Sequence, residues 1–122
     1  LGNTSKEKEV MQKRTLGKTG LEVSEIGLGG LFVSSLGGPF ERGKAATLHA
    51  LELGVNYIDT APTYGNSEES LGQILSYAEQ PVILSTKLGG RPCPFDPKNK
   101  THLRKSFEMS LKSLRREQID IL

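Results

Sequence analysis

The chain of 122 residues is long enough for one small domain, and its 35% hydrophobic and 25% charged residues are typical of a globular protein. Sixteen basic and fourteen acidic residues leave a net charge of +2, which is too small and too dispersed to indicate a nucleic acid or an anionic membrane as partner. No apolar run approaches the roughly 20 residues of a membrane span. The single cysteine, Cys93, allows no internal disulfide, so we expect a cytoplasmic protein.

The patterned part of the sequence begins near residue 13. We expect residues 1–12 to be a disordered extension or a tag remnant, and residues 13–122 to form the folded region. The segments KRTL and LEVS flank Gly17 and Gly20, which permit turn dihedrals, so residues 13–24 predict a β-hairpin.

A strand around residues 25–29 is predicted next, followed by a glycine-rich and serine-rich loop without helical period. The first helix is predicted over residues 41–53, because apolar residues recur along one side and Gly54 can end it as a C-terminal cap. The residues expected on its buried side are Ala45, Leu48 and Leu51.

Two further helices follow from the same periodicity. The second is predicted to begin at Asn66 or Ser67, either of which can accept a hydrogen bond from the first turn. Glu68 and Glu69 suit the positive end of its dipole. The third is predicted over residues 101–116. The expected apolar stripes are Leu71, Ile74, Leu75 and Ala78 in the second helix, and Leu103, Phe107, Leu111 and Leu114 in the third.

Apolar strands alternate with these helices, as VNYIDTA at 55–61, VILSTK at 82–87, and QIDIL at 118–122 as the start of a fourth strand. The strand centres lie 30, 26 and 37 residues apart, and each spacing matches a strand, a crossover helix and a return strand. This pattern predicts a parallel sheet with right-handed connections. The predicted centres are Leu28, Ile58, Leu84 and Ile121.

Two architectures compete for this order of elements. A doubly wound nucleotide-binding domain requires G-x-G-x-x-G at the first turn, but the nearest match, GLGGLF, has Phe32 at the third glycine position. A barrel places functional residues at the C-terminal ends of several strands, where Asp59 and Lys87 are found. We therefore expect an α/β fold, namely the N-terminal half of a (β/α)8 TIM barrel preceded by a β-hairpin and truncated at strand 4. The remainder of the barrel is then an expected partner.

Polar residues on successive strand ends indicate a candidate catalytic site. Asp59 follows a strand that is apolar on both faces, so its carboxylate needs a counter-ion, and Lys87 on the next strand, about 5 Å away, can provide it. Tyr64 lies in a short loop over the same strand ends. A close ammonium stabilises a phenolate, so the phenol could give its proton to a carbonyl oxygen. A plain ion pair and a packing tyrosine are the alternatives, but the three residues together favour function.

These residues resemble the aldo-keto reductase family. The run DTAPTYGNSEESLG at 59–72 is similar to the family signature, and RTLGKTGLEVSEIGLGG at 14–30 is similar to its N-terminal hairpin and first strand. The run VILSTK resembles the third strand, which ends in the catalytic lysine. Since these motifs agree in order and spacing, the resemblance covers nearly everything from residue 14 to residue 122.

The resemblance implies a role for each matching residue. Tyr64 would be the proton donor, Lys87 the residue that makes it a better acid, and Asp59 the residue that orients Lys87 and borders the nicotinamide ribose. It further implies cofactor contacts at the end of the first strand, from Gly29, Gly30 and Leu31. Gly30 stands where many members carry a threonine.

The resemblance also implies what this chain lacks. The family's substrate-binding histidine ends the fourth strand, whereas His49 lies in the first predicted helix and His102 opens the third. The expected position lies just past Leu122. We expect no metal ion in the site. The resemblance implies NADPH as the cofactor, without excluding NADH.

The function expected is NAD(P)H-dependent reduction of a small aldehyde or ketone to an alcohol, with the 122-residue chain alone inactive. One alternative is a non-catalytic, cofactor-binding barrel similar to channel-associated β subunits. Another is a half-barrel that dimerises to cover its open edges.

Overall fold

A computed structural model of the protein describes residues 9–122, and residues 1–8 of the predicted extension lie outside the described residues. The last residues before the hairpin already contact the fold. The carbonyl of Gln12 accepts the backbone N–H of Glu25 at 2.9 Å, and Met11 is half-buried.

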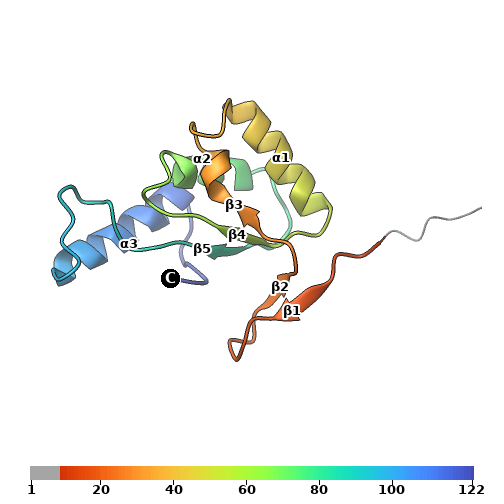
Figure 1. Ribbon diagram of the computed structural model, residues 1–122, viewed down its shortest axis with the longest axis horizontal. Helices are drawn as coiled ribbons and strands as arrows, with labels where there is room; N and C mark the ends of the chain where they lie inside the picture. The colour runs from red at the N-terminus through yellow and green to blue at the C-terminus, as the bar shows by residue number, and fades with distance from the viewer. Residues whose placement is uncertain (1–8) are drawn as a thin grey trace, which may run out of the picture.

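The predicted hairpin is confirmed. Strands β1 (Lys13–Thr15) and β2 (Glu22–Ser24) pair antiparallel, and the glycines at the turn, Gly17 and Gly20, have φ values of 52° and 78° that favour glycine. The hairpin extends away from the helices (Figure 1). Asn56, which directly precedes a strand of the parallel sheet, connects the hairpin to that sheet, because its Oδ1 accepts the Ser24 N–H at 2.7 Å.

The parallel sheet is confirmed, and three of the predicted strand centres lie opposite one another in neighbouring strands. Leu28 pairs with Ile58, and Ile58 pairs with Leu84. Ile121 forms an isolated parallel bridge with Ser85, at the start of the predicted fourth strand. The strands of the sheet, in spatial order, are β3 (Leu28–Gly29), β4 (Tyr57–Asp59) and β5 (Ile83–Ser85).

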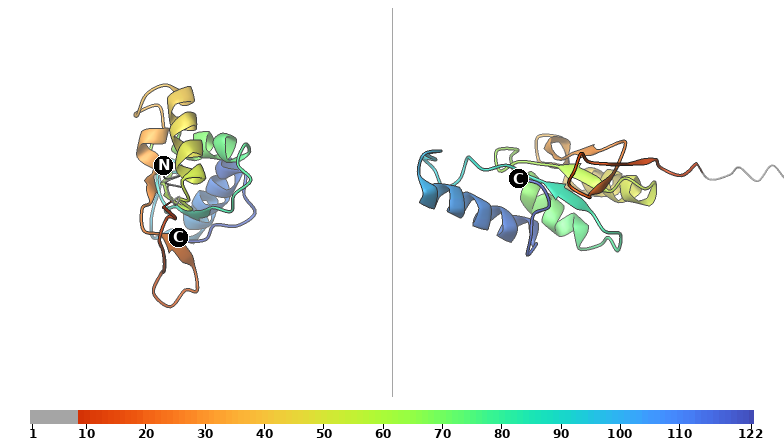
Figure 2. Two further views of the ribbon diagram at one scale, coloured as in Figure 1. Left: turned by 90° about the vertical axis from the view of Figure 1, so that its right-hand side faces the viewer. Right: turned by 90° about the horizontal axis from the view of Figure 1, so that it is seen from below.

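Helices cover one side of this sheet, as Figure 2 shows. The core between the two layers contains fully buried Ile58, Leu71, Ile74, Leu84 and Leu114. Among residues 9–122, no helix is long and apolar enough to cross a membrane. The helices are α1 (Phe40–Glu52), α2 (Ser67–Leu75) and α3 (Lys100–Leu114), together with the short 3-10 helix η1 (Gly30–Val33).

The segment after β3 differs from its prediction as a loop, because it begins with η1. A single turn of four residues is too short to show a periodic pattern of apolar residues. Within this turn Val33 is buried against the core. The remainder of the segment up to Pro39 has no regular secondary structure, as expected.

The buried side of α1 was predicted wrongly in one position. Ala45 is exposed, whereas Thr47 and Leu51 are buried. The hydroxyl of Thr47 donates to the carbonyl of Gly43 at 2.7 Å, so its own helix satisfies the polar group and allows its burial. The stripe that faces the core therefore passes through a polar residue, which a search for apolar periodicity does not detect.

The predicted glycine cap of α1 is confirmed. Gly54 has a φ of 96°, its N–H donates to the carbonyl of Leu51 at 3.0 Å, and the N–H of Val55 donates to that of Ala50 at 3.1 Å. This pair of bonds is a Schellman motif, which satisfies carbonyls that the helix end leaves free.

The helices α2 and α3 pack closely against each other. In α2 the predicted residues Leu71, Ile74 and Leu75 are buried, as expected. In α3 only Leu114 of the predicted stripe is buried, whereas Leu103, Phe107 and Leu111 are half-buried. The buried small residues of α3 are Ser106 and Ser110.

The ends of α3 also differ slightly from the prediction. The helix begins at Lys100, where the side chain of Asn99 accepts the N–H groups of Thr101 and His102 at 2.9 and 3.2 Å. It ends at Leu114 rather than Arg116, because Arg115 takes a left-handed conformation with a φ of 54°.

Candidate active site

The carboxyl ends of β4 and β5 bring Asp59 and Lys87 together. Asp59 is the last residue of β4 and pairs in register with Ser85, two residues before Lys87. The Lys87 ammonium lies 3.1 and 3.2 Å from the two carboxylate oxygens of Asp59. The side chains are 48% and 40% exposed respectively, so the ion pair is open to a ligand.

A third contact fixes the direction of the ammonium. Lys87 Nζ donates to the carbonyl of Thr60 at 2.8 Å, which leaves the group held between β4 and the loop that follows it. Exposed ion pairs contribute only about 0–1 kcal/mol to stability. The stability of the fold therefore does not explain why these groups converge.

Tyr64 lies beside this ammonium. Its backbone is held by the turn that precedes α2, in which its N–H donates to the carbonyl of Ala61 at 3.1 Å and its carbonyl accepts from Ser67 at 3.0 Å. Lys87 Nζ lies 5.2 Å from the centroid of the phenol ring, within the range of a cation–π contact. The structure thus brings Asp59, Tyr64 and Lys87 to one rim of the sheet.

The positions predicted to bind a cofactor have different surroundings. Gly29 is exposed, lies opposite Asp59 in register, and has no atom within 4 Å of the place a Cβ would occupy. Gly30 is buried, and a Cβ there would lie 2.9 Å from the Asp59 carbonyl and 2.9 Å from Ser67 Oγ. Leu31, in η1, is half-buried.

The open backbone at Gly29 and the adjacent carboxylate of Asp59 suit a particular kind of ligand. A flat ring could approach the backbone without a side chain in its way, and a carboxylate accepts hydrogen bonds from sugar hydroxyls. Gly30 contributes by allowing η1 to approach β4 closely, and its carbonyl accepts the Ser67 hydroxyl at 2.7 Å.

The sequence interpretation missed a buried network beneath this rim. Glu68, expected only to favour the helix dipole, is 1% exposed, and its Oε2 accepts the Thr86 hydroxyl at 2.8 Å. Its other oxygen pairs with the Arg91 guanidinium. No local sequence signal could reveal these contacts, because Thr86 and Arg91 lie 18 and 23 residues away.

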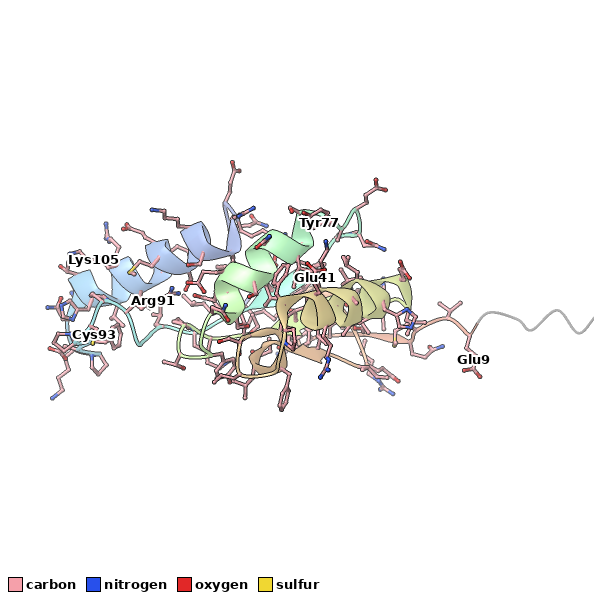
Figure 3. All side chains as sticks on the ribbon, turned by 90° about the horizontal axis from the view of Figure 1, so that it is seen from above. Glu9, Glu41, Tyr77, Arg91, Cys93 and Lys105 are labelled. Atoms are coloured by element: carbon pink, nitrogen blue, oxygen red, sulfur yellow. The ribbon has the colours of Figure 1, made fainter. Side chains whose placement is uncertain are left out.

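Other polar groups of the described residues lie apart from the rim. His49 is exposed on α1 within an ion-pair distance of Glu52, and His102 Nδ1 accepts the N–H of Asp96 at 3.0 Å. Cys93 is exposed at the far end of the loop before α3 (Figure 3). Within residues 9–122, no three His, Cys, Asp or Glu side chains gather as a metal site.

Comparison with known proteins identifies the family. The model of the aldo/keto reductase family matches residues 25–122. The chain belongs to this family. Family members generally depend on NAD(P)H and act on small carbonyl compounds. The similar solved structures include an aldo-keto reductase from Bacillus halodurans in its holo form, with a TM-score of 0.74 and 30% identity, covering 89% of this chain and 38% of that one. The described fold therefore corresponds to part of the family's (β/α)8 barrel.

The curated relatives that the chain matches carry different names. An uncharacterized oxidoreductase of Bacillus subtilis, YqkF, is 37% identical over 91% of this chain, and L-galactose dehydrogenase of Arabidopsis thaliana is 39% identical over 92%. An Arabidopsis thaliana protein named "Probable voltage-gated potassium channel subunit beta" is 31% identical over 92% of this chain. The chain spans 38%, 37% and 36% of the lengths of these relatives.

Proposed function

We propose that the protein containing this chain is an NAD(P)H-dependent reductase that converts a small aldehyde or ketone to an alcohol. In this proposal, residues 13–122 form the first half of the (β/α)8 barrel, residues 1–12 are an extension, and the rest of the barrel completes the site. The protein works in the cytoplasm, since its lone cysteine suits a reducing compartment. The observation that carries the proposal is the Lys87 ammonium, held by Asp59 and directed at the ring of Tyr64.

Each member of the trio has a defined role in this chemistry. Tyr64 donates its phenolic proton to the substrate's carbonyl oxygen, which becomes the hydroxyl of the alcohol. Lys87 stabilises the negative charge that this transfer leaves on the phenolate. Asp59 holds the ammonium in place through its contacts of 3.1 and 3.2 Å.

The nicotinamide end of the cofactor would bind beside the trio. When bound, NAD(P)H supplies the hydride that reduces the carbonyl carbon. Gly29 would leave space for the ring, and Asp59 would accept a hydrogen bond from the ribose. Gly30 and Leu31 would form the adjoining wall. We propose NADPH as the principal cofactor, with NADH as the alternative to be compared in the same assay.

The test is the kinetics of Tyr64→Phe in the full-length protein. We expect kcat for carbonyl reduction to fall by about 10²- to 10⁴-fold, because the proton donor is lost. The affinity for the cofactor, measured by fluorescence titration, should stay the same. Tyr77→Phe is the matched control, because Tyr77 is exposed at the C-terminal end of α2. A Tyr64→Phe variant with the wild-type kcat would refute the proposal.

The similarity to a channel β subunit supports a second candidate, a cofactor-binding barrel with a regulatory role. A regulatory barrel could retain the trio, so the trio does not separate the two candidates. Full-length protein that binds NADPH, turns over no carbonyl compound and captures a potassium channel would favour the regulatory candidate. Turnover that is lost in Tyr64→Phe would favour the enzyme.

A further inference from the structure

We propose that Glu68 and Thr86 are positioning residues that hold Lys87 in place opposite Tyr64. The inference rests on the proposed function only in one respect, because that function makes the alignment of Lys87 with Tyr64 important for catalysis. The alignment itself is a structural property that can be measured separately.

Glu68 connects the segment that contains Tyr64 to the segment that contains Lys87. It belongs to the first turn of α2, which begins at Ser67, three residues after Tyr64. Its side chain is 1% exposed, and its Oε2 accepts the Thr86 hydroxyl at 2.8 Å. The carboxylate thus joins the helix that follows Tyr64 to the residue that precedes Lys87.

The same carboxylate also holds the chain beyond Lys87. Its Oε1 pairs with the guanidinium of Arg91, which lies alongside α3 in Figure 3. The backbone is therefore anchored to one buried group on both sides of Lys87, at Thr86 and at Arg91. The N–H of Thr86 is held as well, because it donates to the carbonyl of Ile121 at 3.0 Å.

Helix stabilisation alone does not explain the burial of Glu68. An exposed acid in the first turn interacts with the helix dipole equally well, and the neighbouring Glu69 does so while 50% exposed. Burial of a carboxylate is costly unless charged and polar partners compensate it. The feature that distinguishes Glu68 from Glu69 is its bond to Thr86.

The position of the Lys87 backbone matters because the ammonium lies at the end of a long side chain. The side chain has four rotatable methylene groups, and its head is half exposed. A shift at the strand end would move Nζ away from the Thr60 carbonyl and from the ring of Tyr64, since these contacts are 2.8 and 5.2 Å long. Misplacement of a catalytic group by about 1 Å can cost about 10²-fold in rate.

The first experiment compares Thr86→Val with Thr86→Ser in the full-length protein. Valine keeps the shape and removes the hydroxyl, whereas serine keeps the hydroxyl. We expect Thr86→Val to lower kcat about tenfold or more, with KM for substrate and cofactor unchanged. Thr86→Ser should retain the wild-type kcat. Equal kinetics for the two variants would overturn the inference.

A second readout does not depend on turnover. Acylation of Lys87 by acetic anhydride, followed by mass spectrometry and normalised to exposed Lys105, reports whether the amine is held. In Thr86→Val the relative rate should rise about tenfold, because a displaced Lys87 ammonium loses its hydrogen bond to the Thr60 carbonyl. Thr86→Ser should match the wild type. Equal acylation of Lys87 in the two variants would overturn the positioning role, even if the kinetics differed.

These readouts separate failure of the inference from failure of the proposed function. If the wild-type protein reduces no carbonyl, the proposed function fails, while acylation still tests the position of Lys87. Should Thr86→Val not fold, Glu68→Gln replaces it, with Glu69→Gln as control because Glu69 also pairs with Arg91 but forms no hydrogen bond with Thr86. Raised acylation in Glu68→Gln alone supports the inference, and equal values in both variants overturn it.

Discussion

Gly29 and Gly30 are neighbours in the sequence with opposite surroundings, and substitution should separate their roles. A Cβ on Gly30 would lie 2.9 Å from the Asp59 carbonyl, Ser67 Oγ and Thr60 Cβ. Overpacking of this kind costs about 1–3 kcal/mol. We expect Gly30→Ala to lower the free energy of unfolding by that amount, as measured by urea denaturation.

Gly29→Ala is the control for this prediction. No atom lies within 4 Å of the added methyl group, so the free energy of unfolding should change by less than about 0.5 kcal/mol. Under the proposed function, the methyl group would instead weaken binding of the cofactor. Equal destabilisation by the two substitutions would contradict the difference in packing.

At the residue scale, the sequence predicts which polar residues lie close together better than it predicts their individual contacts. Asp59 and Lys87 could be selected because charged residues are unusual at the ends of apolar strands, and Tyr64 because its loop lies over the same strand ends. The role of Asn66 could not be predicted. It was one of two residues, with Ser67, that were expected to cap α2, but its side chain instead accepts the N–H of Ser35 at 2.7 Å and holds the loop after η1. Local rules identify a possible cap, whereas a partner 31 residues away becomes visible only in the fold.

The contact between α2 and α3 depends on one glycine. A Cβ on Gly72 would lie 2.2 Å from the backbone carbonyl oxygen of Ser113, so Gly72→Ala must push the helices apart. We expect a net loss of about 2 kcal/mol in the free energy of unfolding, even though alanine favours the helix by about 1 kcal/mol. Gln73→Ala, on the exposed side of α2, should change it by less than about 0.5 kcal/mol. A stabilising Gly72→Ala would show that the helices do not approach this closely.

The start of α3 provides a separate test of an element boundary. The side chain of Asn99 accepts two N–H groups of the first turn, and removal of such a cap costs about 1 kcal/mol. We therefore expect Asn99→Ala to lower the thermal unfolding midpoint. Asn99→Asp keeps an accepting oxygen and should leave the midpoint close to that of the wild type. Equal losses in the two variants would show that the side chain does not cap the helix.

At the element scale, the sequence predicts the order of the elements and which strand residues pair, but it does not predict the buried face of every helix. The predicted strand centres Leu28, Ile58 and Leu84 pair with one another, because the length of a crossover limits where the return strand can begin. The stripe on α1 was partly wrong, since Thr47 is buried and Ala45 is exposed. Burial of a hydroxyl depends on its hydrogen-bond partner, which hydropathy does not describe.

At the scale of the whole molecule, the two faces of the sheet differ. Leu28, Ile58 and Leu84 lie at one level and pack toward the helices. Strand alternation directs Tyr57, Ile83 and Asp59 to the opposite face, where each is only half-buried. In the family's barrel this face is directed inward. Asp59 of the trio therefore lies on a face that the described residues leave partly open to water.

This exposure leads to the prediction that the 122-residue chain alone does not catalyse carbonyl reduction. Charges stabilise a transition state strongly only where water is excluded, whereas Lys87 and Asp59 are 48% and 40% exposed. Neither His49 nor His102 adjoins them, because these residues lie on α1 and α3.

The purified chain should show no oxidation of NADPH above the rate of Tyr64→Phe with aldehyde or ketone substrates. Turnover by the chain that Tyr64→Phe abolishes would contradict the prediction. The mass of the folded chain in solution is the companion measurement, because covering the open sheet face by self-association requires a dimer. A monomeric mass would therefore exclude the half-barrel dimer.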